Sequence, residues 1–352
     1  MNLAGIFVIA VSIEFSLGNQ VKFEDNFNGQ SLDESKWKVE QTLAGGHDWQ
    51  FQWFVNDKEN LYTSNGILNI KPTLTADKFS EEDLYKKEIE IDNQVCTQSH
   101  NFGCSRKGSR SHILNPVRSA SIETKDGFRF GVIEIKAKLP AGDWLRPTIK
   151  LMPKDNVYGP WPKSGQIVLI EARGNRNLHD VDEESHGIDR MTTTVHYGPS
   201  YDLNAWENMH FTAESPEGFH DKFHVFKFDW SKKGMKFFVD EKHYGNFSIA
   251  KDGSFWKKGE FADSALENPW AGGSSMAPFD QKFSISIGLA VGGVSGYFSD
   301  DWENRPDVKP WKDSSQKAAL FFWKGKDKWF KTWTLSSDSA NFQIDYVKII
   351  SQ

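Results

Sequence analysis

The residues of this chain best suited to acid–base chemistry lie in the segment WPKSGQIVLIEARGNRN, from Trp161 to Asn177. In this segment Glu171 follows a short apolar run, and Gln166 and Val168 precede it. A glutamate in a cleft can donate or accept a proton, whereas a glutamine amide and a valine side chain cannot do so near neutral pH. If the segment carries such chemistry, Glu171 must supply it alone.

The face on which Glu171 lies depends on the backbone of this segment, which reads as a β-strand. Alternate residues of a strand share a face. Gln166 and Glu171 are five residues apart, so they share a face only if a β-bulge inserts one residue between Val168 and Glu171. Without a bulge, Glu171 is a solvated charge at a strand end, and the pattern alone leaves this alternative open.

Strand-like alternation recurs along the chain, and helical periodicity nowhere exceeds about two turns. The alternating segments are GILNIKP, GVIEIKAKLP, MTTTVHY, HVFKFDW, MKFFVDEKHYG, FSISIGLAV and FQIDYVKII. Many short strands separated by turn residues predict an all-β, antiparallel two-sheet sandwich. Segments 73–120 and 174–190 are rich in polar residues and are predicted to be long loops.

Composition and charge narrow the function classes. The net charge of −6 argues against a nucleic-acid surface, which requires a basic face. The apolar run at the start predicts a signal peptide at 1–18 and a secreted, extracellular protein whose single domain is 19–352. No later apolar run reaches the length of a membrane span. Aromatic residues make up 14% of the chain, so rings are available both for the core and for stacking on sugars.

The two cysteines of the chain, Cys96 and Cys104, lie in a polar segment. In an oxidising compartment, such a pair predicts a disulfide that closes the loop. A metal site that also uses His100 and His112 is the weaker alternative, because the close C-x-x-C spacing is absent. The sequon that begins at Asn246 predicts a glycosylation site.

Long motifs in this chain resemble those of one known family. YGPWPKSGQIVLIEARGN is similar to the signature of the laminarinase-like glycoside hydrolases of family 16, which reads W-P-x-S-G-E-I-D, two apolar residues, E and then R-G-N. Further segments resemble its arthropod branch, the Gram-negative-bacteria-binding proteins and β-1,3-glucan recognition proteins. These segments are FEDNFNGQSLDESKWKVE, NPWAGGSSMAPFDQKFSISIGLAVGGVSGYFSDDW, KPW, FFWKGKDKW and DYVKI. The resemblance covers nearly the whole chain from about Val21, so we expect no separate N-terminal glucan-binding module.

The resemblance implies a concanavalin- and laminarinase-like β-jelly-roll whose concave sheet forms a glycan-binding cleft, with the bulged strand at its centre. It places Gln166 at the nucleophile position, Val168 at the position of the aspartate that assists it, and Glu171 at the acid/base position. Both of the first two carboxylates are therefore lost, and Glu171 is expected to be a vestigial acid/base. No cofactor or metal is predicted, although some members of the family hold a structural calcium ion that no pattern here identifies.

Family position also indicates the residues that bind glycan. The candidates are Trp144, Trp161, His196, Asn60, Arg173 and Trp270. Trp144 and Trp270 could instead pack in the core, and His196 could be a hydrogen-bonded strand histidine. Arg146 and Lys150 stand where many active relatives have tryptophans. If these two cations face the cleft, we expect weaker binding of neutral glucan and a preference for anionic ligands such as lipopolysaccharide or lipoteichoic acid.

The predicted function is that of a secreted, catalytically inactive pattern-recognition protein that binds microbial β-1,3-glucan or related surface glycans in innate immunity, with immune-signalling proteins as partners. Two alternatives stay open. One is an active endo-1,3-β-glucanase that uses Glu171 and an unrecognised base, and the other is a scaffold that acts only through protein contacts.

Overall fold

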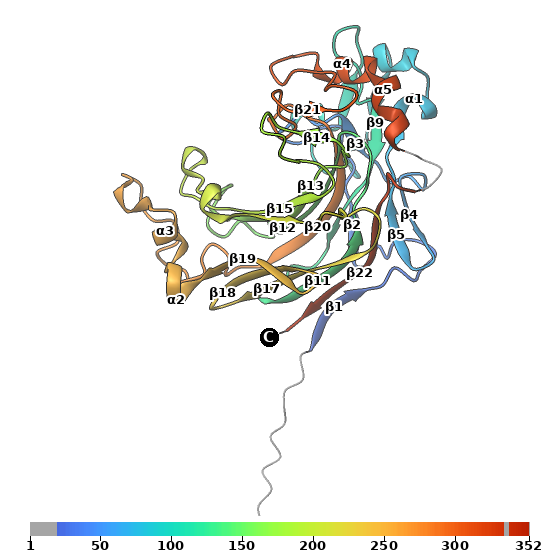
Figure 1. Cartoon of the computed structure of the whole chain (residues 1–352). Helices are drawn as coiled ribbons and strands as arrows, with labels where there is room; N and C mark the ends of the chain where they lie inside the picture. Colours follow the sequence, from blue (N-terminus) through green and yellow to red (C-terminus); the bar gives the residue numbers. More distant parts are fainter. Residues whose placement is uncertain (1–19, 334–337, 352) are drawn as a thin grey trace, which may run out of the picture.

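The structure is a computed structural model that describes residues 20–333 and 338–351. Two curved antiparallel sheets lie one above the other (Figure 1). One has the strand order β19 (Lys242–Ser248), β18 (Gly234–Val239), β17 (His224–Ser231), β11 (Gly131–Lys138), β22 (Phe342–Ile350), β5 (Ile67–Ile70) and β4 (Leu61–Ser64), and β1 (Val21–Asp25) also pairs with β22. The other has the order β16 (His210–Glu214), β15 (Arg190–His196), β13 (Gln166–Ala172), β12 (Leu145–Pro153), β20 (Phe283–Val291), β10 (Ser121–Thr124) and β2 (Trp37–Val39). The predicted all-β antiparallel sandwich is confirmed.

The second sheet has one face in the core and one face open to a cleft, and β12 illustrates why. Leu145, Ile149 and Leu151 point into the core and are buried, whereas Arg146 and Lys150 alternate with them and line the cleft. In β20 the buried Ile285, Ile287, Leu289 and Val291 alternate in the same way with Ser286, Gly288 and Ala290. This period of two presents a row of polar and small side chains to the cleft.

Shorter elements surround the two sheets. A three-stranded sheet contains β3 (Gln52–Phe54), β9 (Val117–Ser119) and β6 (Thr73–Leu74), and two-stranded pairs join β7 (Glu88–Glu90) to β8 (Ser105–Lys107) and β14 (Leu178–His179) to β21 (Glu303–Asn304). The α-helices are α1 (Thr75–Lys78), α2 (Ile249–Asp252), α3 (Phe255–Lys258), α4 (Ala318–Lys324) and α5 (Lys326–Trp329). The 3-10 turns are η1 (Glu82–Tyr85), η2 (His100–Phe102), η3 (Tyr201–Leu203), η4 (Trp206–Met209), η5 (Phe261–Asp263) and η6 (Phe330–Trp333).

Segments 73–120 and 174–190 are therefore more ordered than the predicted loops. The first contains β6 to β9, and the second contains β14 and the first residue of β15. The strands β6 to β9 and β14 are only two or three residues long, and β3 and β9 come from segments more than 60 residues apart. Alternation over so few residues gives no signal in the sequence.

The cysteine pair forms the expected disulfide between Cys96 and Cys104, with Cα atoms 5.7 Å apart. This closes the loop that precedes β8 and contains η2. The predicted signal peptide at 1–18 lies outside the described residues. None of the helices in the described part of the chain is long and apolar enough to cross a membrane.

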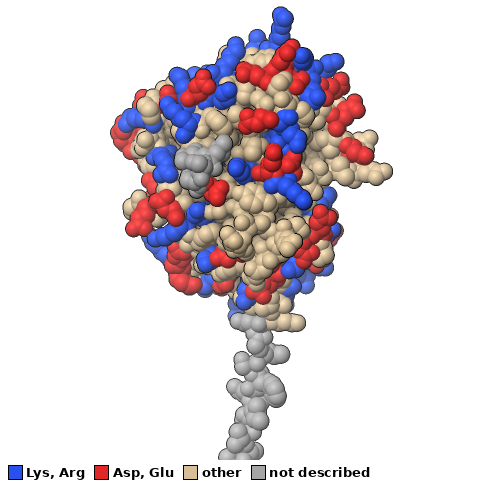
Figure 2. All heavy atoms as spheres, turned by 90° about the vertical axis from the view of Figure 1, so that its right-hand side faces the viewer, with Lys and Arg blue, Asp and Glu red and all other residues tan. Residues whose placement is uncertain are grey.

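Charged side chains of both signs are interspersed on the face of the molecule that carries α1, β4 and β5 (Figure 2). On this face neither sign gathers into a continuous area, which is consistent with the small net charge of −6. Asn246 lies exposed on β19, the edge strand of its sheet, so its side chain is accessible for the predicted glycosylation.

Candidate functional site

The strand β13 contains the bulge on which the position of Glu171 depends. Against β15, Val168 pairs with Thr194 and Glu171 pairs with Thr192, so two residues of β13 oppose the single residue Thr193. The pairing of β13 with β12 shifts at the same place. The extra residue brings Gln166, Val168 and Glu171 to one face, where all three line a cleft of about 1120 Å³. The alternative of a solvated charge at a strand end is therefore excluded.

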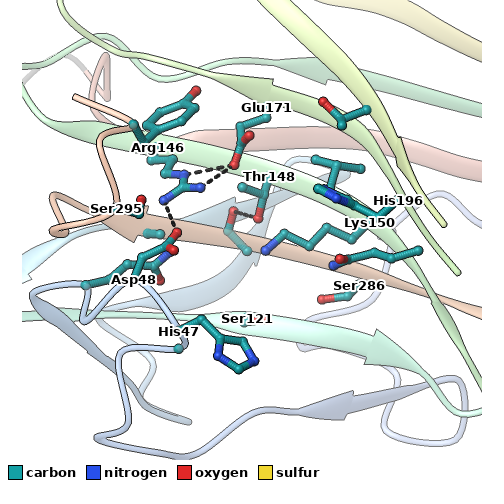
Figure 3. Close-up of a pocket in the computed structure, with 18 of the residues that line it drawn as sticks. His47, Asp48, Ser121, Arg146, Thr148, Lys150, Glu171, His196, Ser286 and Ser295 are labelled. Atoms are coloured by element: carbon teal, nitrogen blue, oxygen red, sulfur yellow. Dashed lines mark hydrogen bonds and ion pairs between the residues drawn. The ribbon is translucent and has the colours of Figure 1, made fainter. Parts of the chain in front are cut away.

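Glu171 forms an ion pair at the floor of this cleft (Figure 3). The Nε and Nη2 groups of Arg146 donate to Oε1 of Glu171 at 2.8 and 2.7 Å, and its Nη1 group donates to Oδ2 of Asp48 at 2.5 Å. The guanidinium carbon lies 3.9 Å from the centre of the Tyr297 ring. The side chains of Arg146 and Glu171 are only 9% and 13% exposed, so water screens this pair weakly.

These charges fix the protonation of Glu171. Burial alone would raise its pKa, but the neighbouring cations Arg146 and Lys150 outweigh burial and hold the pKa below its ordinary value. The same balance lowers the pKa of Asp48, again chiefly through Arg146. Both carboxylates are consequently ionised at neutral pH, and Glu171 holds no proton to donate.

Lys150 extends across the same floor and forms no hydrogen bond or ion pair with the other residues that the structure describes (Figure 3). Burial lowers its pKa, and the attraction of Glu171 offsets this effect only in part. Arg146 and Lys150 thus both face the cleft. Of these two cations, Lys150 has a charge that is free to meet a ligand, whereas Arg146 is neutralised by two carboxylates.

Three of the predicted glycan-binding residues line the cleft. Trp161 donates its Nε1–H to Oε1 of Gln166 at 3.1 Å, and its ring lies 5.7 Å from that of His196. Burial lowers the pKa of His196 to about 4, so its imidazole is neutral at physiological pH. Arg173 also lines the cleft, although its Nε and Nη2 groups both donate to the carbonyl oxygen of Tyr297.

The other three candidates lie elsewhere, and their prediction as cleft residues is wrong. Trp144 is 1% exposed and packs against Phe298 and Trp311. Trp270 is 4% exposed and donates its Nε1–H to the carbonyl oxygen of Lys163.

Asn60, the third of these, is fully buried and has a structural role. Its amide donates to Lys71 O, Thr73 Oγ1 and Arg118 O, and so joins β6 to β9. A tryptophan can pack in a core or stack on a sugar, and a buried asparagine leaves no periodic pattern in the sequence. Residue type alone therefore could not show that Trp144, Trp270 and Asn60 lie outside the cleft.

Sequence reasoning missed two exposed rings of the cleft, Tyr201 and Trp206, which are 72% and 38% exposed. The Tyr201 ring lies 5.5 Å from that of Trp161, and the Trp206 ring lies 5.7 Å from that of His210, which also lines the cleft. We call the rings of Trp161, Tyr201 and Trp206 the aromatic rim. Large rings within the polar, non-alternating segment YDLNAWENMH were the available signal. Asp48 was also missed, because its role depends on Arg146, which is distant in sequence.

The lining of the cleft suits an extended polar molecule. The aromatic rim offers stacking faces for sugar rings. The hydroxyl groups of Thr148, Thr192, Thr194 and Ser286 also line the cleft and can form hydrogen bonds to a polar ligand. Gln166, which the resemblance places at the nucleophile position, accepts a hydrogen bond from Trp161, and its amide nitrogen lies 3.2 Å from Sδ of Met152.

Known proteins resemble this chain in both sequence and fold. The chain is 39% identical over 341 residues to a β-1,3-glucan-binding protein of Penaeus monodon, and the match covers 93% of this chain and 89% of that protein. It is 32% identical to β-1,3-glucan-binding protein 1 of Galleria mellonella over 95% of this chain, and here it spans only 64% of the relative's length. It is 29% identical to Gram-negative bacteria-binding protein 3 of Drosophila melanogaster over 94% of this chain and 64% of that protein.

Among solved structures, the laminarinase from Rhodothermus marinus has a TM-score of 0.57 at 19% identity, with 95% of this chain and 97% of that one covered. A Z. galactanivorans protein in complex with laminaritriose and laminaritetraose has a TM-score of 0.56 at 17% identity and covers 94% of this chain and 98% of that one. Residues 47–258 match Glycosyl hydrolases family 16, and the identity to the Penaeus protein extends over nearly the whole chain. The chain belongs to glycosyl hydrolases family 16.

Proposed function

We propose that this protein binds β-1,3-glucan or a related microbial surface glycan in the cleft without hydrolysing it, as a secreted pattern-recognition protein of innate immunity. The names of the relatives as β-1,3-glucan-binding and Gram-negative bacteria-binding proteins support the binding role. The observation that carries the proposal is the arrangement of Gln166, Val168 and Glu171 on the cleft floor, with Glu171 paired to Arg146.

The chemistry of glycoside hydrolysis supports the absence of turnover. A retaining glycosidase needs one carboxylate to attack the sugar and a protonated carboxyl group to assist the leaving oxygen. The Gln166 amide has no negative charge with which to attack the sugar. Glu171 has no proton for the leaving oxygen, because Arg146 keeps it ionised. Loss of a covalent nucleophile alone costs on the order of 10⁶ in turnover, which is about 8 kcal/mol of barrier.

Binding needs neither group, and the cleft keeps the features that it does need. Sugar rings stack on exposed aromatic faces, and Trp161, Tyr201 and Trp206 provide such faces at one end. Lys150 adds an unpaired cation on the floor, which would favour a glycan that carries phosphate or carboxylate groups. The expected preference for anionic ligands therefore depends on Lys150, because Arg146 is already paired.

Retention on insoluble β-1,3-glucan tests this proposal. The wild-type protein should sediment with curdlan, and Tyr201→Ala with Trp206→Ala should weaken retention by about tenfold through loss of two stacking faces. Val181→Ser is the matched control, because Val181 is 82% exposed and does not line the cleft. Retention that is absent in the wild type, or equal in the rim variant and the control, would favour a scaffold that acts through protein contacts.

A further inference from the structure

A second cavity, of about 900 Å³, lies beside the cleft, and Gln50 lines both. Its walls come from the segment before β3, from the disulfide loop with β8, and from the start of α4. The apolar part of its lining includes Phe51, Ile113, Val294, Ala318 and Leu320. This volume is within the range of small-molecule sites. We refer to this cavity as the α4 groove.

Two exposed aromatic side chains line the α4 groove. Trp49 is 46% exposed and Phe102 is 68% exposed. Both residues have positive φ angles, 48° and 62°, which bulky residues seldom adopt. Large apolar side chains exposed in this way beside a cavity are characteristic of sites that bind an apolar partner.

The α4 groove also contains a cation with no anionic partner. Arg106 donates to Oδ1 of Asn115 at 2.6 Å and to the carbonyl oxygen of Asn101 at 2.8 Å, and it forms no ion pair with any carboxylate of the described residues. Burial of this unpaired guanidinium lowers its pKa to about 10. Arg106 is half-buried, and a charge that is partly withdrawn from water is costly unless an anion compensates it.

The acidic residues of the α4 groove do not supply that anion. Glu88 pairs with Lys107 at 3.8 Å, and Asp313 pairs with Lys309 at 2.6 Å. Lys317, which is exposed at the start of α4, also forms no ion pair with the described residues. The α4 groove thus combines apolar walls with two cations, Arg106 and Lys317, whose charge is not balanced within it.

We propose that the α4 groove binds an anionic amphiphile, a molecule with one acyl chain and a phosphate or carboxylate headgroup. The chain would lie against Phe102, Trp49 and the apolar wall, while the headgroup would meet Arg106 and Lys317. A neutral oligosaccharide fits this lining poorly, because its hydroxyl groups would face apolar atoms and leave Arg106 unbalanced. The inference is independent of the glycan proposal, since its residues lie outside the cleft.

Titration calorimetry of the full chain with dodecyl phosphate, below its micelle concentration, tests this inference. Dodecyl maltoside supplies the same chain with a neutral head, and inorganic phosphate supplies the anion alone. We expect saturable binding of one dodecyl phosphate, with an affinity about tenfold higher than that of either comparison probe, because only this probe satisfies both parts of the site.

Surface variants separate the two contributions without disturbing Arg106, which also holds neighbouring loops. Phe102→Ser should weaken binding of dodecyl phosphate by about tenfold, and Lys317→Gln by about threefold with no change for dodecyl maltoside. Val181→Ser should bind as the wild type does, and all three variants should keep wild-type retention on curdlan.

Equal affinity for dodecyl phosphate and dodecyl maltoside would overturn the inference, as would binding that Phe102→Ser leaves unchanged. A wild-type protein that is not retained on curdlan would instead contradict the glycan proposal alone. The two failures are therefore distinguishable in one set of measurements.

Discussion

At the scale of single residues, a few side chains determine the charge on the cleft floor. Gln166 and Val168 carry no charge, and Arg146 neutralises Glu171. An unpaired Glu171 on this buried floor would be driven to take up a proton. Arg146 prevents this and leaves Glu171 as a structural anion rather than an acid.

The pairing predicts that restoring two carboxylates is not sufficient for activity. Gln166→Glu with Val168→Asp should release little reducing sugar from laminarin, because Arg146 still keeps Glu171 ionised. Adding Arg146→Trp should raise the release by at least about tenfold over the double variant. A double variant as active as the triple variant would show that Arg146 does not suppress the acid.

The same ion pair predicts a pH-dependent contribution to stability. The folded-state pKa values of Glu171 and Asp48 lie below their ordinary values of 4.5 and 3.8. Their stabilisation is therefore fully present above these values and is lost as pH falls through the lower folded-state values.

Arg146→Leu should consequently lower the free energy of unfolding by about 3–5 kcal/mol at pH 7, because it leaves two buried anions unpaired. The difference between the variant and the wild type should shrink at pH 3, where the anions become protonated. Urea unfolding at the two pH values measures both quantities, and a difference that does not change with pH would rule out the pair as its source.

At the scale of elements, the bulge in β13 determines which side chains reach the cleft. Deleting Leu169 should remove the extra residue and turn either Glu171 or Gln166 and Val168 away from the cleft floor, since a shift of one residue exchanges the two faces of a strand. We expect a large loss of thermal stability, because a charge or an amide would then enter the core.

Leu169→Met is the matched control for this deletion. It keeps the number of residues and nearly the volume, so it should cost less than about 1.5 kcal/mol. Circular dichroism melts of the two variants make the comparison. A deletion variant as stable as Leu169→Met would mean that the bulge does not hold the register.

The elements also show how far the sequence could predict the structure. Long alternating segments such as those of β11, β17 and β20 were predicted correctly, because their period of two extends over eight or nine residues. MKFFVDEKHYG turns at Asp240 and Glu241, which both have positive φ, and forms the hairpin of β18 and β19 rather than one strand. The burial of Trp144 and Trp270 depends on contacts between distant segments, which no local pattern records.

At the scale of the whole molecule, the family 16 fold holds an open cleft in which Glu171 is paired with Arg146 and ionised. The sheet presents hydroxyl groups, and the turns beside it present aromatic rings, to a cleft of about 1120 Å³. The α4 groove lies beside it, on the other side of the segment that contains Asp48 and Trp49. A microbial surface that displays both glycan and anionic amphiphiles could therefore be contacted at two neighbouring sites, in accordance with the two proposals.

The most direct test of the central proposal measures binding and release in one sample. The purified protein is incubated with laminarin, and bound glucan and newly formed reducing ends are both quantified. We predict saturable binding with reducing-end formation no faster than in a sample without protein. Release of sugar that Glu171→Gln abolishes would contradict the proposal and would establish the protein as an active endo-1,3-β-glucanase.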